Sequence, residues 1–209
     1  MKNMIKEVTN LNQICKGFNS DSTYIIRNGE VLSHSFSNKK NSCYIRMRRS
    51  DGEPILSDEI FVGVNGQELY QFIKTSKENK TPVVLVDVEK HLLRVANERT
   101  SYYAKFDKSV NNFYKEVKRG IKNFKRKDCK TIDITDEVIS ALNNNLPIII
   151  NNGDIRLRFS KKFIKIRYTD KIEDVKLHYH YINDELFIVN IEVEKDNYII
   201  EHMFYAIRF

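Results

Sequence analysis

The sequence predicts an α+β protein in which short helices pack on antiparallel sheets. Apolar and polar residues alternate in many short runs, which is the pattern of half-buried strands. The dipeptide Asn28-Gly29 joins two such runs, and Asn-Gly is the strongest short-range signal for a β-hairpin. Helical spacing occurs only in isolated segments between these runs, whereas a parallel βαβ fold would alternate strand and helix strictly.

The first half of the chain reads as two copies of one unit, a short helix followed by antiparallel strands. A helix is predicted over residues 6–19, where apolar residues recur every three or four positions. Strands then flank the Asn28-Gly29 turn. The later elements are a strand over 41–49, a strand over 60–64, a helix over 66–76, and a meander over 83–106 with a turn at Glu89-Lys90-His91.

The second half begins with a long basic helix over Val110–Arg126. A strand, a helix capped by Thr135 or Asp136, and an antiparallel sheet follow. Phe61–Phe106 and Ile132–Tyr168 share the order strand, helix, polar loop, strand, turn, strand, which is a weak internal repeat. We therefore predict two domains, residues 1–107 and a shortened second domain, residues 108–209.

Composition narrows the class of protein. The 209 residues carry a formal net charge of +7, which favours a polyanionic partner. Cys15, Cys43 and Cys129 are odd in number and form no CxxC, so neither a disulfide framework nor a zinc site is predicted. We find neither a signal peptide nor an apolar run of the roughly 20 residues that span a bilayer. We expect a cytoplasmic protein without a membrane partner.

Motifs for catalysis are weak. His178 and His180 share one strand face, but no third metal ligand stands near them in the sequence. Asp87, Glu89 and Lys90 hint at the acidic strand of metal-dependent nucleases, but their spacing does not fit that motif. A phosphate-binding glycine loop and a nucleophile elbow are both missing. We expect no enzymatic activity, no cofactor and no bound metal.

Charge is segregated on the predicted helix Val110–Arg126. One stripe is apolar and consists of Val110, Phe113, Val117, Ile121 and Phe124. The other side gathers six cations: Lys115, Lys118, Arg119, Lys122, Lys125 and Arg126. A solvated face usually mixes charge signs, whereas here only Glu116 lies between the two sets. Phosphates would compensate the repulsion between these cations, so the sequence predicts a DNA-binding face.

Four further lysines are weaker candidates for DNA contact. Lys6 and Lys16 lie on the first predicted helix, away from its apolar face, and Lys74 and Lys77 lie at the end of the second. Lysines in a last helical turn are also favoured by the helix dipole. The sequence carries neither aromatic RNA-binding signatures nor a helix-turn-helix pattern, so we expect phosphate contact without base readout.

The first half of the chain resembles the DNA sliding clamps, especially the phage-type clamp of T-even viruses. The resemblance covers about residues 5–106 and rests on the order and pattern of the elements. The segments that carry it are NLNQICKGF, STYIIRNGEVLS, CYIRM, IFVGVNGQELYQFIKTS and VVLVDVEKHLLRVANERTSYYAKF. The second half departs from the family pattern, because its first helix is longer and more basic and no second clear helix follows His180.

The resemblance implies a function without catalysis. Sliding clamps are head-to-tail rings whose sheets continue across subunit contacts and whose helices line a central hole. Two domains per chain would imply a homotrimer that encircles double-stranded DNA. Its partners would be a DNA polymerase and a clamp loader, with the polymerase tethered between a sheet and a connector near residues 104–112. A phage-encoded protein of this kind would work in the cytoplasm of its bacterial host.

Two other classes stay open. The first is a viral accessory factor of replication or transcription that binds nucleic acid as a monomer, through the basic helix alone. The second is a divergent metal-dependent nuclease. Mass in solution separates a ring from a monomer, and metal-dependent cleavage would reveal a nuclease.

Overall fold

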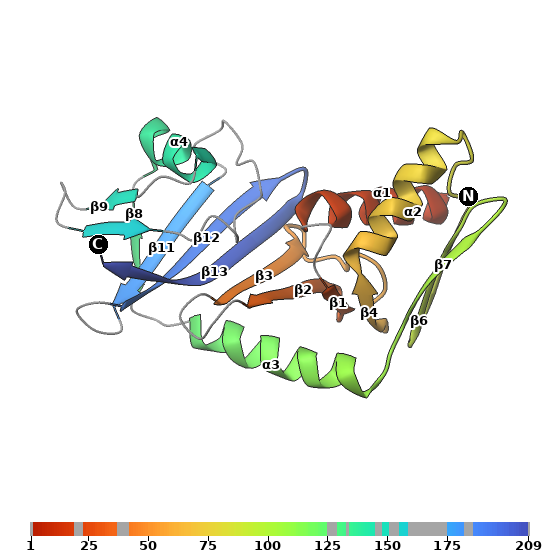
Figure 1. Cartoon of the computed structure of the whole chain (residues 1–209), viewed down its shortest axis with the longest axis horizontal. Coiled ribbons are helices and arrows are strands. Elements are labelled where there is room, and N and C mark those ends of the chain that lie inside the picture. Colours follow the sequence, from red (N-terminus) through yellow and green to blue (C-terminus); the bar gives the residue numbers. More distant parts are fainter. Residues whose placement is uncertain are drawn as a thin grey trace. The chain divides into compact units, whose positions relative to one another are not determined.

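The protein has the predicted α+β architecture (Figure 1). The structure is a computed structural model and describes residues 2–18, 23–36, 42–124, 129–132, 134–144, 148–150, 155–158, 175–181 and 186–208. The strand pairings it describes are antiparallel. Within the described residues, helices and strands follow the order that the hydrophobic patterns predict.

The chain divides into two compact units. Unit 1 comprises Met1–Ser33 and Arg46–Val117, and unit 2 comprises His34–Ile45 and Lys118–Phe209. The division falls inside the basic helix, ten residues after the predicted boundary at 107/108. The split into two clamp-like domains stays a prediction, since a compact unit need not be a domain of that type.

Unit 1 contains most of the segments that carry the resemblance. Its elements are α1 (Lys2–Gly17), β1 (Thr23–Arg27), β2 (Glu30–Phe36), β3 (Ser42–Arg49), β4 (Phe61–Asn65), α2 (Gly66–Glu78), β5 (Leu85–Glu89), β6 (Leu92–Ala96), β7 (Ser101–Lys105) and α3 (Lys108–Phe124). The strands β2 and β3 and the helix α3 each continue into unit 2. The sheet order in unit 1 is β5-β6-β7-β4-β1-β2-β3.

The hairpin predicted at Asn28-Gly29 is confirmed. Arg27 pairs with Glu30, and the two residues between them have positive φ angles of 53° and 71°. A two-residue turn of this kind matches the twist of the flanking strands and favours asparagine and glycine. Gly29 is also sterically required, because a Cβ there would lie 2.9 Å from the Cα atom of Pro54.

The helices of unit 1 cover both faces of its sheet. Tyr24 of β1 and Tyr102 of β7 point toward α1 and α2, since their rings lie 5.2 Å from Phe18 and 6.4 Å from Phe72. The opposite face carries α3, whose Tyr114 ring lies 4.2 Å from the guanidinium carbon of Arg27. Figure 1 shows α1 and α2 on one side of β1 and β4, and α3 on the other.

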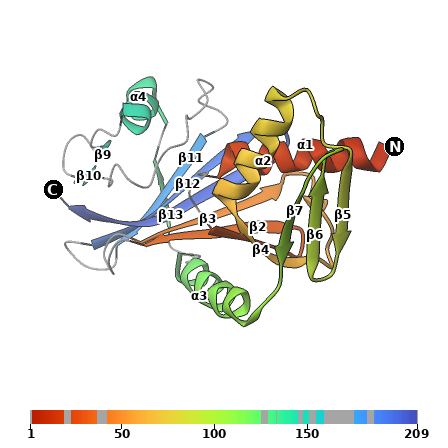
Figure 2. The same ribbon diagram turned by 45° about the vertical axis from the view of Figure 1, so that its right-hand side comes forward.

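The strand β5 lies at the open edge of the unit 1 sheet (Figure 2). Its sequence pattern places Val84, Val86 and Val88 on one side of a strand. In the structure Val84 lies just before the strand with 41% of its surface exposed, and Val86 and Val88 are half-buried. This exposure fits the position of β5, which has a neighbouring strand only on its β6 side within the described sheet.

Unit 2 continues the antiparallel arrangement. Its further elements are β8 (Lys130–Ile132), α4 (Asp136–Asn144), β9 (Ile148–Ile150), β10 (Ile155–Arg158), β11 (Val175–Tyr181), β12 (Leu186–Lys195) and β13 (Tyr198–Arg208). The strand order is β13-β12-β11-β8, with β10 on β13 and β9 on β10. Thr135 caps α4 as predicted, because its Oγ1 accepts the amide of Val138 at 3.3 Å. Most of the predicted repeat between residues 145 and 168 lies outside the described residues.

His202 makes the stability of the fold depend on pH. The side chain is fully buried on β13, and this burial lowers its pKa from 6.5 to about 4. Below about pH 6.5 the unfolded chain binds a proton that the folded chain excludes, so folding weakens until the pH reaches the folded pKa. We expect a loss of about 3 kcal/mol of unfolding free energy from this residue between about pH 7 and pH 4.

Urea denaturation across this pH range, compared with a His202→Leu variant, measures the effect. The variant removes the titrating group, so its unfolding free energy should fall less steeply with acid than that of the wild type. Parallel pH profiles for the two proteins would show that His202 does not control the acid response.

Candidate nucleic-acid interface

The helix α3 begins at a capping aspartate. The Asp107 carboxylate accepts the backbone amide of Val110 at 2.9 Å and the hydroxyl of Ser109 at 2.6 Å. These hydrogen bonds, that of Ser109 first, lower the pKa of Asp107. A carboxylate at this position also stabilises the positive end of the helix dipole. The helix therefore starts at Lys108, two residues before the predicted start.

The apolar stripe of α3 faces the protein, as its spacing predicts. Val117, Ile121 and Phe124 are buried, and Val110 and Phe113 are half-buried. Two glycines allow α3 to pack closely against the strands. A Cβ on Gly63 of β4 would lie 2.6 Å from Val110, and a Cβ on Gly120 of α3 would overlap the ring of Tyr44. The helix is thus fixed in rotation, with its opposite face toward solvent.

We expect Gly120→Ala to destabilise the fold although alanine is the better helix former. The ring of Tyr44 is held by a stack on His34 at 4.3 Å and by Phe124 at 5.7 Å, so it cannot yield freely. Overpacking should cost about 1–3 kcal/mol of unfolding free energy in chemical denaturation. In a Tyr44→Ala background the same change should instead stabilise by up to about 1 kcal/mol. Equal effects in both backgrounds would refute the contact.

The exposed face of α3 is cationic. Lys108, Lys115, Arg119 and Lys122 are exposed. At about 100° per residue they fall within roughly 60° of the helix circumference, opposite the apolar stripe. They span about 20 Å along the axis at about 1.5 Å per residue. Among the described residues these four make no ion pair. We call these four residues the α3 basic face.

The structure changes the predicted set of α3 residues. Lys118 is half-buried at the flank of the basic face and has a partner interaction of its own. Lys125 and Arg126 lie outside the described residues. Lys108 was not predicted, because the predicted helix began at Val110. The aspartate that precedes it was the available signal, since Asp before a helical pattern marks an N-cap.

The weaker candidates lie on the other side of the sheet. Lys6 is exposed on α1, and Lys74 and Lys77 are exposed on α2. The Nζ atom of Lys74 lies 3.8 Å from the Glu78 carboxylate, so its charge is partly offset. The side chain of Lys16 lies outside the described part of the chain. A straight duplex that contacts Lys115 on α3 therefore cannot also contact these lysines, because the sheet of unit 1 separates them.

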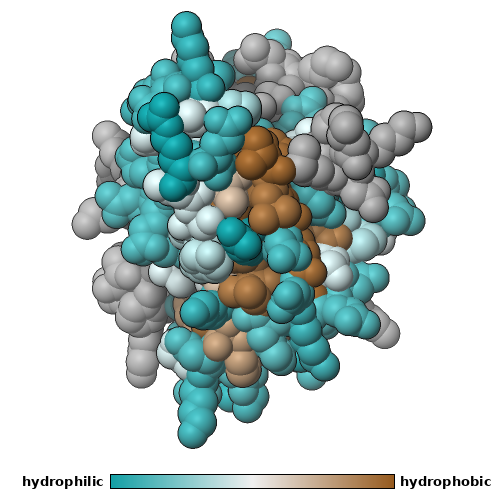
Figure 3. Space-filling model, turned by 90° about the vertical axis from the view of Figure 1, so that its right-hand side faces the viewer, coloured by the Kyte–Doolittle hydropathy of each residue, from teal (hydrophilic) through white to brown (hydrophobic). Residues whose placement is uncertain are grey.

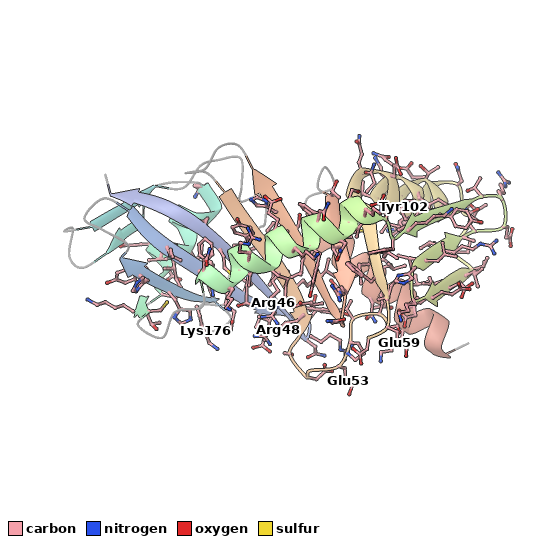
Figure 4. All side chains as sticks on the ribbon, turned by 90° about the horizontal axis from the view of Figure 1, so that it is seen from below. Arg46, Arg48, Glu53, Glu59, Tyr102 and Lys176 are labelled. Carbon is pink, nitrogen blue, oxygen red and sulfur yellow. The ribbon has the colours of Figure 1, made fainter. Side chains whose placement is uncertain are left out.

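Two arginines of β3 lie beside α3 (Figure 4). Tyr44 packs on α3, and the strand alternation places Arg46 and Arg48 on the same face of the sheet. Arg46 is engaged, because its Nε donates to the Glu30 carboxylate at 2.6 Å. Arg48 is half-buried and also has a partner. We therefore do not count Arg46 and Arg48 among the free cations of this surface.

The described residues contain no group of three or more histidine, cysteine or acidic side chains that could hold a metal ion. The Nδ1 atom of His178 lies 3.0 Å from the hydroxyl of Thr131 on β8. Asp87 stands opposite Arg94 in the β5–β6 register. The absence of enzymatic activity stays a prediction. Within the described helices, none is long and apolar enough to cross a membrane.

A groove of about 480 Å³ lies between α2 and the turn that joins β6 to β7. Phe72 and Tyr102 contribute aromatic surface, and Arg99 contributes a cation. Asn97 fixes this turn, because its Oδ1 accepts the amides of Arg99 at 2.9 Å and Thr100 at 2.8 Å. Residues 104–112, near which the resemblance places the connector that borders the polymerase site, do not line this groove.

Comparison with known proteins assigns no family. No family model matches the chain, and no curated protein matches it. A solved structure described as the C-terminal region of FEN-1 bound to A. fulgidus PCNA is similar in fold, at 14% sequence identity and a TM-score of 0.46. The match covers 98% of this chain and 94% of that chain. A likeness of this degree does not establish a family or a function.

Proposed function

We propose that the protein is a sliding-clamp-type processivity factor that holds duplex DNA by its phosphates and tethers a polymerase. The α3 basic face carries the proposal. It presents four exposed, unpaired cations in line over about 20 Å, a length that faces about six phosphates of one strand. Such a face attracts the DNA backbone and reads no base identity, as a sliding protein requires.

Binding measurements at several salt concentrations test the DNA contact. If the four cations of the α3 basic face each neutralise one phosphate, the slope of log K against log salt is about −3 to −4. Two duplexes of unrelated sequence should bind with equal affinity, because phosphates carry no sequence information. A flat salt dependence, or a strong preference for one duplex, would contradict the proposal.

The ring form of the proposal rests on the edge strand β5. Figure 3 shows a hydrophobic band on the side of the molecule where β5 lies. Val84, the residue before β5, is 41% exposed. A sheet edge without a neighbouring strand can recruit a strand of another chain. Pairing with an edge strand of the next copy would supply the missing backbone hydrogen bonds of β5. In a closed ring every copy makes this pairing. We propose a head-to-tail homotrimer of two clamp-like domains per chain.

An open form is the second candidate. It is favoured by the position of α3, which lies on the opposite face of the unit 1 sheet from α1 and α2. In a ring lined by α1 and α2, the α3 basic face would point away from the enclosed duplex. In the open form a monomer binds DNA directly through α3 and acts as a replication or transcription accessory factor.

Retention on DNA circles separates the two forms. A closed ring on a nicked circular duplex should survive a wash with concentrated salt and should be lost after the circle is cut. The open form should dissociate from circular and linear DNA alike, because salt screens its phosphate contacts. We expect the cytoplasm as the compartment, since all three cysteines are free thiols in the structure.

A further inference from the structure

Tyr103 of β7 is an aromatic side chain that is not packed in the hydrophobic core. It is 49% exposed, whereas its neighbour Tyr102 is buried on the opposite face of the strand. Lys105 pairs with Gly63 of β4, and Gly63 lies against Val110 of α3. Residues two apart on a strand share a face, so Tyr103 lies on the face of the sheet that carries α3.

Cations border the Tyr103 ring on this face. Arg94 of β6 is its direct cross-strand neighbour, with the guanidinium carbon 5.8 Å from the ring centroid. Lys105 is exposed two residues along β7, and Lys108 opens the α3 basic face three residues later. We call Arg94, Tyr103 and Lys105 the Tyr103 platform. The platform and the α3 basic face thus follow one another along the chain and share a face of the sheet.

Two carboxylates of the edge strand β5 border the Tyr103 platform. Asp87 stands opposite Arg94, and Glu89 stands opposite Leu92, both on β5. They repel phosphates at the edge of the sheet. The favourable path for a polyanion therefore runs over β6 and β7 toward Lys108, not across β5.

We propose that the Tyr103 platform binds single-stranded nucleic acid, with one unpaired base stacked on Tyr103 and its phosphates on Arg94, Lys105 and Lys108. This inference rests on the proposed function and names the form of DNA that this part of the surface accepts. Bases inside a duplex have both faces covered by their neighbours, so a base from within the strand must be unpaired to stack on the exposed ring. The strand would continue into the duplex held by α3, as at a recessed primer end.

Binding of a labelled thymidine oligonucleotide of about 20 nucleotides, measured by fluorescence anisotropy, tests the platform. Tyr103→Ala should weaken this binding by about 5-fold or more, since stacking of one base on an aromatic ring is worth about that much. Tyr103→Phe keeps the ring and should bind as the wild type does. Tyr70→Ala is the matched control, because Tyr70 is 39% exposed on α2, on the other face of the sheet.

The same variants are measured with a duplex of the same length. Tyr103→Ala should leave duplex affinity unchanged. Unchanged oligonucleotide binding in Tyr103→Ala, an equal loss in Tyr70→Ala, or an equal loss for duplex and oligonucleotide would each overturn the platform. These results differ from a failure of the proposed function, in which the wild type does not bind duplex at low salt.

Crosslinking gives a second measurement that needs no variant. An oligonucleotide with a single 5-iododeoxyuridine, irradiated in complex with the wild-type protein, should form its adduct on the peptide that contains Tyr103. An adduct on Tyr70 or on α2 would overturn the assignment. Displacement of the oligonucleotide by an acidic peptide at equal charge concentration would also overturn it, because a peptide supplies charge but no stacking base.

Discussion

Replacing Lys115, Arg119 and Lys122 with glutamate is expected to lower duplex DNA affinity by at least ~100-fold at low salt. The three side chains are exposed, so the variant should keep the wild-type melting temperature. The buried residues Val117 and Ile121 point the other way and are unchanged. The slope of log K against log salt should fall by about 3, one for each lost phosphate contact. Filter binding or anisotropy over a salt series measures both quantities.

A matched triple variant on the other face of the sheet provides the control. Lys6→Glu, Lys74→Glu and Lys77→Glu change the net charge by the same amount on α1 and α2. If long-range attraction alone held the DNA, the two triple variants would lose affinity equally. We expect a loss below about 10-fold for the control, because these lysines do not face the α3 side. A larger loss of affinity in the control variant than in the α3 variant would place the DNA on α1 and α2. It would then support a ring lined by these two helices.

The purified protein is expected to have a trimer mass of about 74 kDa in light scattering, three times the 24.7 kDa of the chain. The double variant Val84→Lys, Leu85→Lys should shift it to the monomer mass. Lysines on an edge strand keep other strands away, because pairing would bury their charges. Val84 is exposed and Leu85 half-buried, so the folded monomer should tolerate both changes.

Tyr70→Lys serves as the control for this experiment. Tyr70 is exposed to nearly the same degree as Val84, but it lies on α2 instead of the sheet edge. It should leave the mass unchanged. A wild-type monomer at high concentration would favour the open form. A dimer would indicate that two copies of β5 pair with each other, which closes the edge without a ring.

Local patterns in the sequence were sufficient for the individual elements. Asn28-Gly29 specifies its hairpin because only a few residues adopt positive φ angles at both turn positions. The amphipathic spacing of α3 specifies both a helix and the side that is buried. The cap at Thr135 depends on one side chain and an amide three residues away. Each of these features is decided by residues within one or two turns of chain.

Edges and faces could not be predicted in this way. The alternation in β5 indicates a strand but not that the strand is the last in its sheet, where Val84 is 41% exposed. Likewise, alternation shows that Tyr102 and Tyr103 point to opposite sides, but not which side holds the core. That choice depends on pairing with strands and helices far away in the sequence.

The sequence by itself therefore determined that this protein is an α+β chain with a segregated basic helix. Only the tertiary structure decided where that helix lies. The contact between Gly63 and Val110 joins residues 47 positions apart. A glycine on β4 has no side chain that would contribute to a hydrophobic pattern, so the sequence does not indicate this contact. Within unit 1, this packing puts the first half of α3 on the sheet face opposite α1 and α2, the face that also carries Tyr103. Helical periodicity fixes which residues share a face, whereas long-range packing fixes what that face meets.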